Sequence, residues 1–282
     1  MKIGIVDVGG GYRGIYGAGI LDYCMDNDIR FDIAIGVSAG SVNLLSYAAN
    51  QDRRNYQFYT EYGQRKECTS AKNLIEKKAI IDLDYVYSDI SNSDGENPLD
   101  FEAAMSNPME FYAVATDAFT GKPVYFGKFD IKQDHYDALK ASSALPIVSH
   151  PYEIGNALYF DGTLSDPVPI KKAFDLGCDK VVVILTKPLG DLELTPVDEG
   201  VSTLIYKKYP NMSINLYTRI EKYNKSVEDA LQLEKEGKAL IIAPDDTCGV
   251  STLTKDKTLL NDLYEKGYRD AKKISEFFKV DI

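Results

Sequence analysis

The sequence predicts an α/β fold in which a mostly parallel sheet carries helices on its faces. The first fifty residues twice alternate strand, turn and helix. Strands are predicted over Lys2–Val8 and in "FDIAIGVSAG", and helices over Ile15–Met25 and Ala39–Ala49. A later run, "KVVVILT" (Lys180–Thr186), is apolar from Val181 to Leu185, as strands covered on both faces are. These observations favour a buried sheet with crossover helices.

The remaining elements continue the alternation of strands and helices. Further strands are predicted at Glu110–Ala115 with its hairpin partner "KPVYFGKF", on either side of the Gly155–Asn156 turn, and in "ALIIAP". Further helices are predicted at 51–67, 73–83, 134–144, 168–176, 203–237 and 258–278. The stretch "YSDISNSDGENP" (Tyr87–Pro98) is predicted to be a turn-rich surface loop.

Composition limits the classes of protein to consider. The chain has 282 residues, of which 44% are hydrophobic, enough for one large domain with a sizeable core. Its net charge of −11, without a basic cluster, argues against nucleic-acid binding and against steady electrostatic docking on anionic membranes. A transient, hydrophobic contact with a membrane or micelle surface stays open.

The cysteines and the apolar runs bear on metal sites and location. Cys24, Cys68, Cys178 and Cys248 form no C-x-x-C pair and lie far from both histidines, so we expect free thiols and no zinc site. No apolar run approaches the ~18 residues of a membrane-spanning helix. A soluble cytoplasmic protein is therefore expected.

The first candidate site is the glycine-rich stretch "DVGGGYRGIYGAG" after the first strand. Gly9, Gly11 and Gly14 fit G-x-G-x-x-G, which binds dinucleotides when an acidic residue ends the next strand. That strand ends in Gly36–Val37–Ser38, and Asp32 stands at its start instead. A nucleotide site is therefore disfavoured, and a plain tight turn and an anion-stabilising loop remain as alternatives.

The second candidate is "GVSAG", Gly36 to Gly40, a G-x-S-x-G nucleophile elbow. A serine at the tip of a sharp strand-to-helix turn adopts strained backbone angles, and only small residues fit two positions before and after it. The turn places Ser38 at the N-terminus of a helix, where the dipole favours negative charge. The alternative is a serine that only caps the helix.

The third candidate is "YFDGT", Tyr159 to Thr163, in which Asp161 precedes a glycine. On its own, Asp-Gly is a turn dipeptide. A nucleophilic serine needs a base, however, and no histidine follows Asp161 in the chain. His135 is expected at the surface, and His150, before a proline, stays open as the base.

The remaining candidate for the base is a carboxylate that takes the proton directly. An ordinary aspartate, with a pKa of ~3.9, is a weak base for a hydroxyl. Apolar neighbours such as Tyr159 and Phe160 are expected to raise the pKa of Asp161 toward neutrality.

In this order, the three stretches resemble the patatin-like phospholipases, a family of bacterial and plant lipid acyl hydrolases. The resemblance rests on "GGGYRG" (9–14), "GVSAG" (36–40) and Asp161–Gly162, with the segment 141–162 leading to the aspartate. Its recognisable part covers about Lys2 to Thr186.

The resemblance implies a Ser–Asp dyad without histidine. Ser38 is then the nucleophile and Asp161 the base, and the amides of Gly10, Gly11 and Ala39 form the oxyanion hole. The other motif positions are Gly9, Arg13, Gly14, Gly36, Gly40 and Gly162.

Two motif positions carry separate expectations. Arg13 is expected to rigidify the loop by hydrogen bonding rather than to touch substrate. Thr163 departs from the family's usual glycine or alanine, which puts catalytic efficiency in doubt more than mechanism.

The resemblance further implies a three-layer sandwich. Residues 1–190 are expected to form the catalytic domain, and 191–282 a mainly helical C-terminal portion packed on it. The expected function is a serine hydrolase of phospholipase A, lysophospholipase or esterase type that acts on lipid acyl esters without metal or cofactor. The polar stretch 51–98 is a candidate lid or substrate-approach region, or else a solvated helical cap. A nucleotide-binding protein and a catalytically silent lipid-binding member are the alternatives.

Overall fold

The central strand of the structure is the first one in the chain. A computed structural model describes residues 1–77, 79–146 and 148–279. In β1 (Ile3–Asp7) every residue is buried, and β1 pairs in parallel with β2 (Ile33–Val37) on one side and β7 (Lys180–Ile184) on the other. Because both faces are covered, the strand is apolar up to Val6, and it ends at Asp7, shortly before the glycines.

The sheet has eight strands within the described residues. Its order is β5-β6-β3-β2-β1-β7-β8, with β4 pairing β3 beside this path. The five strands from β3 to β8 run parallel, and β4, β5 and β6 are added in antiparallel pairs. The remaining bounds are β3 (Glu110–Asp117), β4 (Pro123–Gly127), β5 (Tyr152–Ile154), β6 (Ala157–Asp161) and β8 (Ala239–Ile242).

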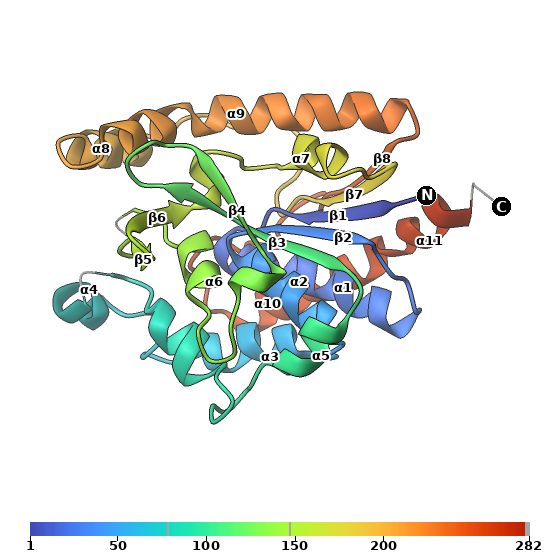
Figure 1. Cartoon of the computed structure of the whole chain (residues 1–282), viewed down its shortest axis with the longest axis horizontal. Helices are drawn as coiled ribbons and strands as arrows, with labels where there is room; N and C mark the ends of the chain where they lie inside the picture. The colour runs from blue at the N-terminus through green and yellow to red at the C-terminus, as the bar shows by residue number, and fades with distance from the viewer. Residues whose placement is uncertain (78, 147, 280–282) are drawn as a thin grey trace.

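Helices cover both faces of the sheet and complete the three-layer α/β sandwich that the sequence predicts. Figure 1 shows α7, α8 and α9 above the sheet and the other helices below it. The helices are α1 (Ile15–Asp26), α2 (Ala39–Ala48), α3 (Arg54–Thr60), α4 (Ala71–Lys77), α5 (Phe101–Ser106), α6 (Asp137–Ser142), α7 (Ile170–Asp175), α8 (Pro196–Ile205), α9 (Pro210–Lys235), α10 (Lys257–Asp270) and α11 (Lys272–Lys279).

Alternate residues of the parallel strands pack into two separate hydrophobic cores, one on each face of the sheet. In β1, Ile3 and Ile5 pack into the core beneath the sheet, and Val6 belongs to the core above it. This period of two follows from the pleat of a strand and holds the sheet between its two helical layers.

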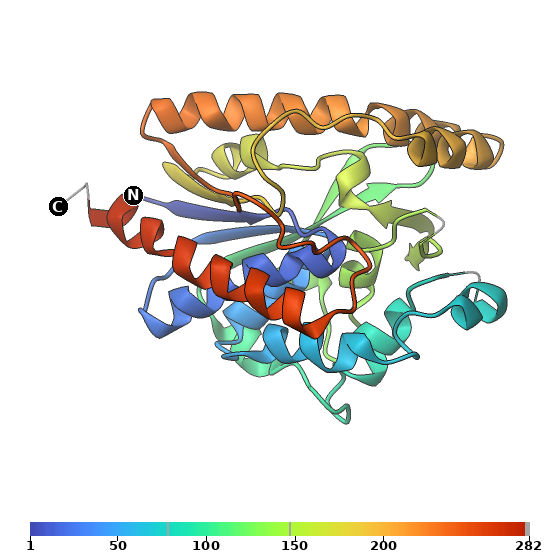
Figure 2. The ribbon, with the colours of Figure 1, turned by 180° about the vertical axis from the view of Figure 1, so that it is seen from behind.

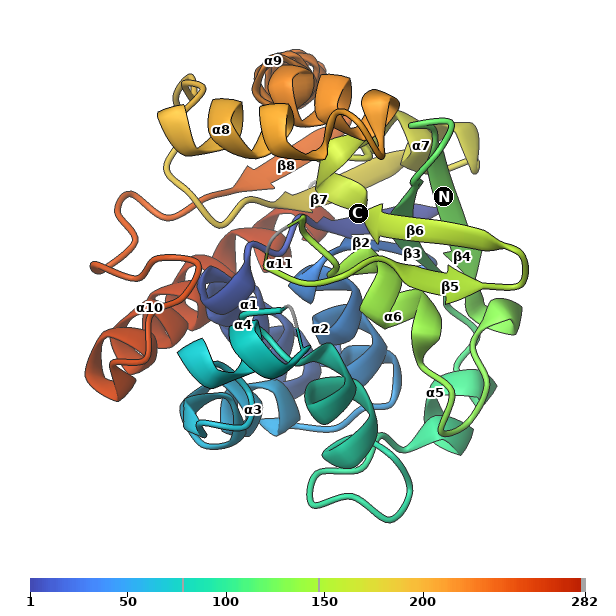
Figure 3. The ribbon, with the colours of Figure 1, turned by 90° about the vertical axis from the view of Figure 1, so that its left-hand side faces the viewer.

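The carboxyl ends of the parallel strands meet at one edge, which faces the viewer in Figure 3. The chain passes from β1 to β2 on one side, and β7 enters later on the other side. In open α/β sheets, ligands bind outside the carboxyl ends of the strands where the strand order reverses. The glycine loop after β1 and the elbow after β2 therefore share the edge where a site is expected.

The C-terminal part of the chain adds to both faces and to the edge of the sheet. β8 pairs in parallel with β7, and α10 lies along α1 at the back (Figure 2). The two helices cross closely, because a Cβ on Gly267 would lie 2.1 Å from the carbonyl oxygen of Tyr16. The predicted boundary near residue 190 stays a prediction, and residues 280–282 of the predicted C-terminal portion lie outside the described residues.

Several predicted elements differ from the structure in detail. The predicted helix 203–237 is split by Pro210 into α8 and α9, and the predicted helix 258–278 breaks at Ala271. Only 54–60 of the predicted helix 51–67 is α-helical. The short helix α5 was not predicted, and residue 78 of the predicted helix 73–83 lies outside the described residues.

The stretch Tyr87–Pro98 is turn-rich, as predicted, but only part of it lies at the surface. Tyr87, Ser91 and Asn97 are buried. The buried guanidinium of Arg54 donates to the Ser91 hydroxyl at 3.1 Å and to the Asn97 carbonyl at 2.8 Å. Because a buried cation needs acceptors, this loop is folded inward around Arg54.

Within the described ranges, no helix combines the length and the apolar composition needed to cross a bilayer.

The close crossing of α1 and α10 generates a stability prediction. Gly267→Ala places a methyl group against the α1 backbone, which cannot move aside as a flexible side chain would. We expect the free energy of unfolding to fall by about 1–3 kcal/mol, measured by urea denaturation. The matched control is Gly200→Ala in α8, where nothing lies within 4 Å of the added Cβ and a gain of about 0.5–1 kcal/mol is expected. Equal effects of the two substitutions would contradict the close crossing.

Candidate active site

Ser38 occupies the sharp turn between β2 and α2. Its backbone angles, φ 55° and ψ −133°, are ones that non-glycine residues rarely adopt, so the residue is strained. A Cβ on Gly36 would lie 2.2 Å from the Cα of Ser41, and one on Gly40 would lie 2.2 Å from the carbonyl oxygen of Asp7. The steric reasons given for the elbow therefore hold in the structure.

Two further serines fix the backbone of Ser38. The Ser38 amide donates to the hydroxyl of Ser142 at 3.0 Å, and the hydroxyl of Ser41 donates to the Ser38 carbonyl at 2.7 Å. All three are buried. Sequence reasoning missed Ser142, because its contact joins residues 104 positions apart. The contact of Ser41 is local, since Ser41 lies in the first turn of the helix that follows Ser38, and it could have been predicted.

Asp161 ends β6 and is fully buried. Its amide donates to the Ala144 carbonyl at 2.9 Å, and its Oδ1 accepts from the Thr163 amide at 2.8 Å. The adjacent Gly162 has no room for a side chain, because a Cβ there would lie 2.4 Å from the carbonyl oxygen of Val114. Thr163 thus supplies a backbone donor that orients the carboxyl group.

The surroundings of Asp161 shift the pKa of its carboxyl group. Burial raises its pKa to about 6, and hydrogen bonding from the Thr163 amide and the Ser38 side chain opposes that rise. Oδ2, however, accepts no aligned hydrogen bond from the described residues. The Ser38 side chain is thus near enough to act on the carboxyl group of Asp161, without an aligned hydrogen bond to Oδ2. Such loose geometry is common in catalytic pairs without substrate.

The glycine loop presents bare backbone beside Ser38. Gly9, Gly10 and Gly11 have φ values of 63°, 117° and 61°, a succession that side chains would strain. Within the described residues, the amides of Gly10 and Gly11 donate to no protein acceptor. Ala39 opens α2, and the first amides of a helix also lack partners inside it. Three predicted donors are thus available near Ser38.

A buried carboxyl group lies beneath the loop. Asp7 accepts from the Gly9 amide at 2.9 Å through Oδ1 and from the Asn43 side chain at 3.0 Å through Oδ2. Burial raises its pKa to about 6, against the effect of these two donors. Sequence reasoning missed both Asp7 and Asn43. The pattern Asp-x-Gly after a strand was the available signal for Asp7, since aspartate commonly bonds its own backbone two residues on.

Arg13 lies against the loop and reaches the C-terminal part of the chain. Its Nη1 donates to the hydroxyl of Thr252 at 2.9 Å, and the Thr252 carbonyl accepts from the Tyr12 amide at 3.2 Å. Gly14 offers its carbonyl to the side chain of Asn43 at 2.9 Å. Arg13 thus holds the loop to Thr252, in line with its expected role.

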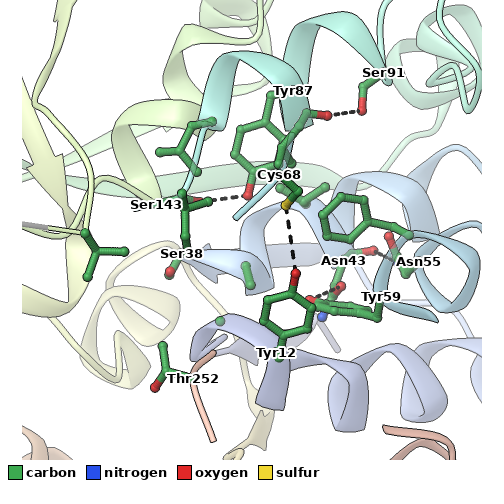
Figure 4. Close-up of a pocket in the computed structure, with 18 of the residues that line it drawn as sticks. Tyr12, Ser38, Asn43, Asn55, Tyr59, Cys68, Tyr87, Ser91, Ser143 and Thr252 are labelled. Atoms are coloured by element: carbon green, nitrogen blue, oxygen red, sulfur yellow. Dashed lines mark hydrogen bonds between the residues drawn. The ribbon is translucent and has the colours of Figure 1, made fainter. Parts of the chain in front are cut away.

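An apolar cavity of about 80 Å³ opens at Ser38. Figure 4 shows Ser38 at its edge, with Tyr12, Tyr59 and Tyr87 around the space. Much of its wall comes from the stretch 51–98, including Phe58, Ile81, Leu83 and Val86. That stretch therefore lines a cavity beside Ser38. Whether it moves as a lid stays a prediction.

Neither histidine lines the apolar cavity at Ser38. His150 is exposed and packs on the ring of Tyr152, with ring centroids 4.7 Å apart, and His135 is exposed in the turn before α6. Across the described ranges, no group of three His, Cys, Asp or Glu residues is placed to hold a metal ion.

Comparisons with known proteins agree with the fold and the motifs. A family model described as "Patatin-like phospholipase" matches residues 8–174, and one described as "Domain of unknown function (DUF6363)" matches residues 209–279. An uncharacterized protein of Escherichia coli K12, YjjU, is 32% identical over 195 residues, which is 66% of this chain and 52% of that protein. The chain thus spans about half the length of this relative.

Two further proteins share shorter or weaker similarity. An uncharacterized NTE family protein of Mycobacterium tuberculosis H37Rv, Rv1063c, is 32% identical over 77 residues, covering 27% of this chain and 20% of that protein. The crystal structure of VipD from Legionella pneumophila matches 96% of this chain and 66% of its own, with a TM-score of 0.49 and 13% identity. The family model covers more than half of the chain, including the glycine loop, the elbow and Asp161. The chain belongs to the patatin-like phospholipase family.

Proposed function

We propose that the protein is a serine hydrolase that cleaves acyl ester bonds of lipids through Ser38 and Asp161. The observation that carries the proposal is the strained Ser38, placed beside a buried carboxyl group and at the mouth of an apolar cavity. Strain of this kind persists only where surrounding contacts enforce it, and it gathers at functional sites. Family membership supports the same class of substrate.

The first step of the mechanism is acylation of the enzyme. Asp161 accepts the hydroxyl proton of Ser38 as the Ser38 oxygen attacks the ester carbonyl. The carbonyl oxygen becomes negative and accepts hydrogen bonds from the amides of Gly10, Gly11 and Ala39. One such donor is typically worth ~3 kcal/mol of transition-state stabilisation, which compensates for a carboxylate that is a weaker base than histidine. Asp161 returns the proton to the departing alcohol.

The second step releases the fatty acid. Asp161 takes a proton from water, which attacks the acyl-enzyme, and the Ser38 oxygen leaves with that proton. The aromatic and aliphatic walls of the cavity from the stretch 51–98 would hold the acyl chain. No step uses a metal or a nucleotide. The protein reaches its lipid substrate through a transient contact with a membrane or micelle surface. The four unpaired cysteines favour a cytoplasmic location.

Labelling with a fluorophosphonate tests the nucleophile. Wild-type protein is expected to be labelled covalently, and Ser38→Ala to lose all labelling because the attacking oxygen is gone. Asp161→Asn is expected to slow labelling by about 10²- to 10⁴-fold, the usual contribution of a positioned base. The measurement is gel fluorescence against time.

The control for labelling is Ser106→Ala, which removes an exposed hydroxyl far from the loop and should label like wild type. An unlabelled wild type would contradict the enzyme assignment and favour a silent lipid-binding member. A nicotinamide or flavin cofactor retained on the purified protein would favour nucleotide binding instead.

The raised pKa of Asp161 predicts the pH dependence of the reaction. Only the ionised carboxylate accepts a proton, so kcat/KM for a short p-nitrophenyl ester should rise about tenfold per pH unit below about 6 and level off above it. Asp7 also has a pKa of about 6, and Asp7→Asn separates the two groups, since the inflection should persist in that variant. An inflection near pH 4, or one lost in Asp7→Asn, would contradict the role of Asp161.

A further inference from the structure

A second cavity lies on the other side of Ser38. It measures about 240 Å³ and shares Ser38, Gly11, Leu145 and Thr252 with the apolar cavity. Its other walls come from the glycine loop, the segment 163–167, the segment after β7 and one face of α9. An ester whose carbonyl lies at Ser38 therefore has two spaces available, one for the acyl chain and one for the alcohol part.

The second cavity is basic, although the protein carries a net charge of −11. Arg13, Lys187 and Arg219 line it, and no Asp or Glu is among the described residues that do. The nearest acidic partner, Asp198, lies on α8 and accepts a hydrogen bond from Nη2 of Arg219. Asp161 is the other carboxyl group close enough to act on Arg219. Three cations thus face two carboxyl groups, and one of those two is the proposed base.

Lys187 is the cation left without a counterion. Within the part of the chain that the structure describes, its ammonium group forms no ion pair or hydrogen bond. Burial lowers its pKa, the charges of Arg13 and Arg219 lower it further, and the charge of Asp198 acts in the opposite direction. Nε of Arg13 and Nε of Arg219 are buried and lack acceptors among the described residues. The cluster is therefore short of anionic oxygen, which a ligand would supply.

We propose that Lys187 and Arg219 form a subsite for a phosphate group on the alcohol part of the substrate. The subsite rests on the proposed function, and it selects acyl esters of a phosphorylated alcohol, such as 1-acylglycerol 3-phosphate, over the neutral monoacylglycerol. Lysine and arginine together suit phosphate, since arginine offers a planar set of donors and lysine a compact charge. Arg219 lies in the region that matches the domain of unknown function, which thereby contributes to substrate recognition.

Binding of non-hydrolysable ether lipids tests the subsite without catalysis. We expect wild type to bind 1-alkylglycerol 3-phosphate roughly 10- to 100-fold more tightly than 1-alkylglycerol, measured by calorimetry below the micellar concentration. Lys187→Gln should lose most of this preference, and Lys187→Arg should keep most of it. The matched control is Lys171→Gln, which removes an equal charge from an exposed side chain on α7 and should keep the full preference.

Turnover of the matching esters and inhibition by inorganic phosphate complete the test. The ratio of kcat/KM for the phosphorylated and the neutral ester should fall roughly 10- to 100-fold in Lys187→Gln. One outcome is that free phosphate inhibits wild type but not Lys187→Gln, and that wild type shows no preference for the phosphorylated ester. This outcome would identify a site for free phosphate and overturn the lipid subsite. A preference for the phosphorylated ester that persists in Lys187→Gln would also overturn the lipid subsite.

Failure of the proposed function has a different signature. In that case neither ester is hydrolysed and fluorophosphonate does not label Ser38, while the ether lipids still report on the subsite. Melting temperatures of all variants show whether a lost preference comes from unfolding. If Lys187→Gln does not fold, equal affinity of wild type for the two ether lipids is sufficient to reject the subsite.

Discussion

The carboxyl group of Asp7 is the constraint on which the site depends. It sits at the end of the central strand and joins the Gly9 amide to the Asn43 side chain, so one buried group connects the glycine loop with the helix that follows Ser38. The carbonyl of Asp7 also touches Gly40 so closely that no side chain fits there. The backbone amides of the loop and Ser38 are thereby fixed relative to each other before any ligand arrives. Such preorganisation is what electrostatic catalysis requires.

The parts of the site that were predictable come from local sequence. A strand followed by G-x-S-x-G and a run of small residues predicts a strained turn, because sterics within five residues decide its shape. The structure places Ser38 in that turn. Likewise, the apolar run before the glycines predicts β1, and the alternation of elements predicts a parallel sheet.

The parts that could not be predicted depend on contacts between distant segments. Ser142 holds the Ser38 amide and Thr252 holds Arg13, and neither lies in a motif of its own. The inward fold of Tyr87–Pro98 follows from the burial of Arg54, which composition alone does not reveal. The clustering of Lys187 with Arg219 requires α9 to lie over the end of β7. The net charge of the acidic chain does not reveal such a basic cluster, because it sums the charges of all residues.

The tight fit between α1 and α10 has a consequence for how the protein is made. α1 follows the first strand, yet its outer surface is covered by α10, which is synthesised long after it. The central strand likewise waits for β7 to complete its pairing. The nascent chain therefore carries exposed apolar surface until α10 has been made, and contacts of such large sequence separation form slowly. Protection by a chaperone is of most value to this chain before α10 and α11 can pack.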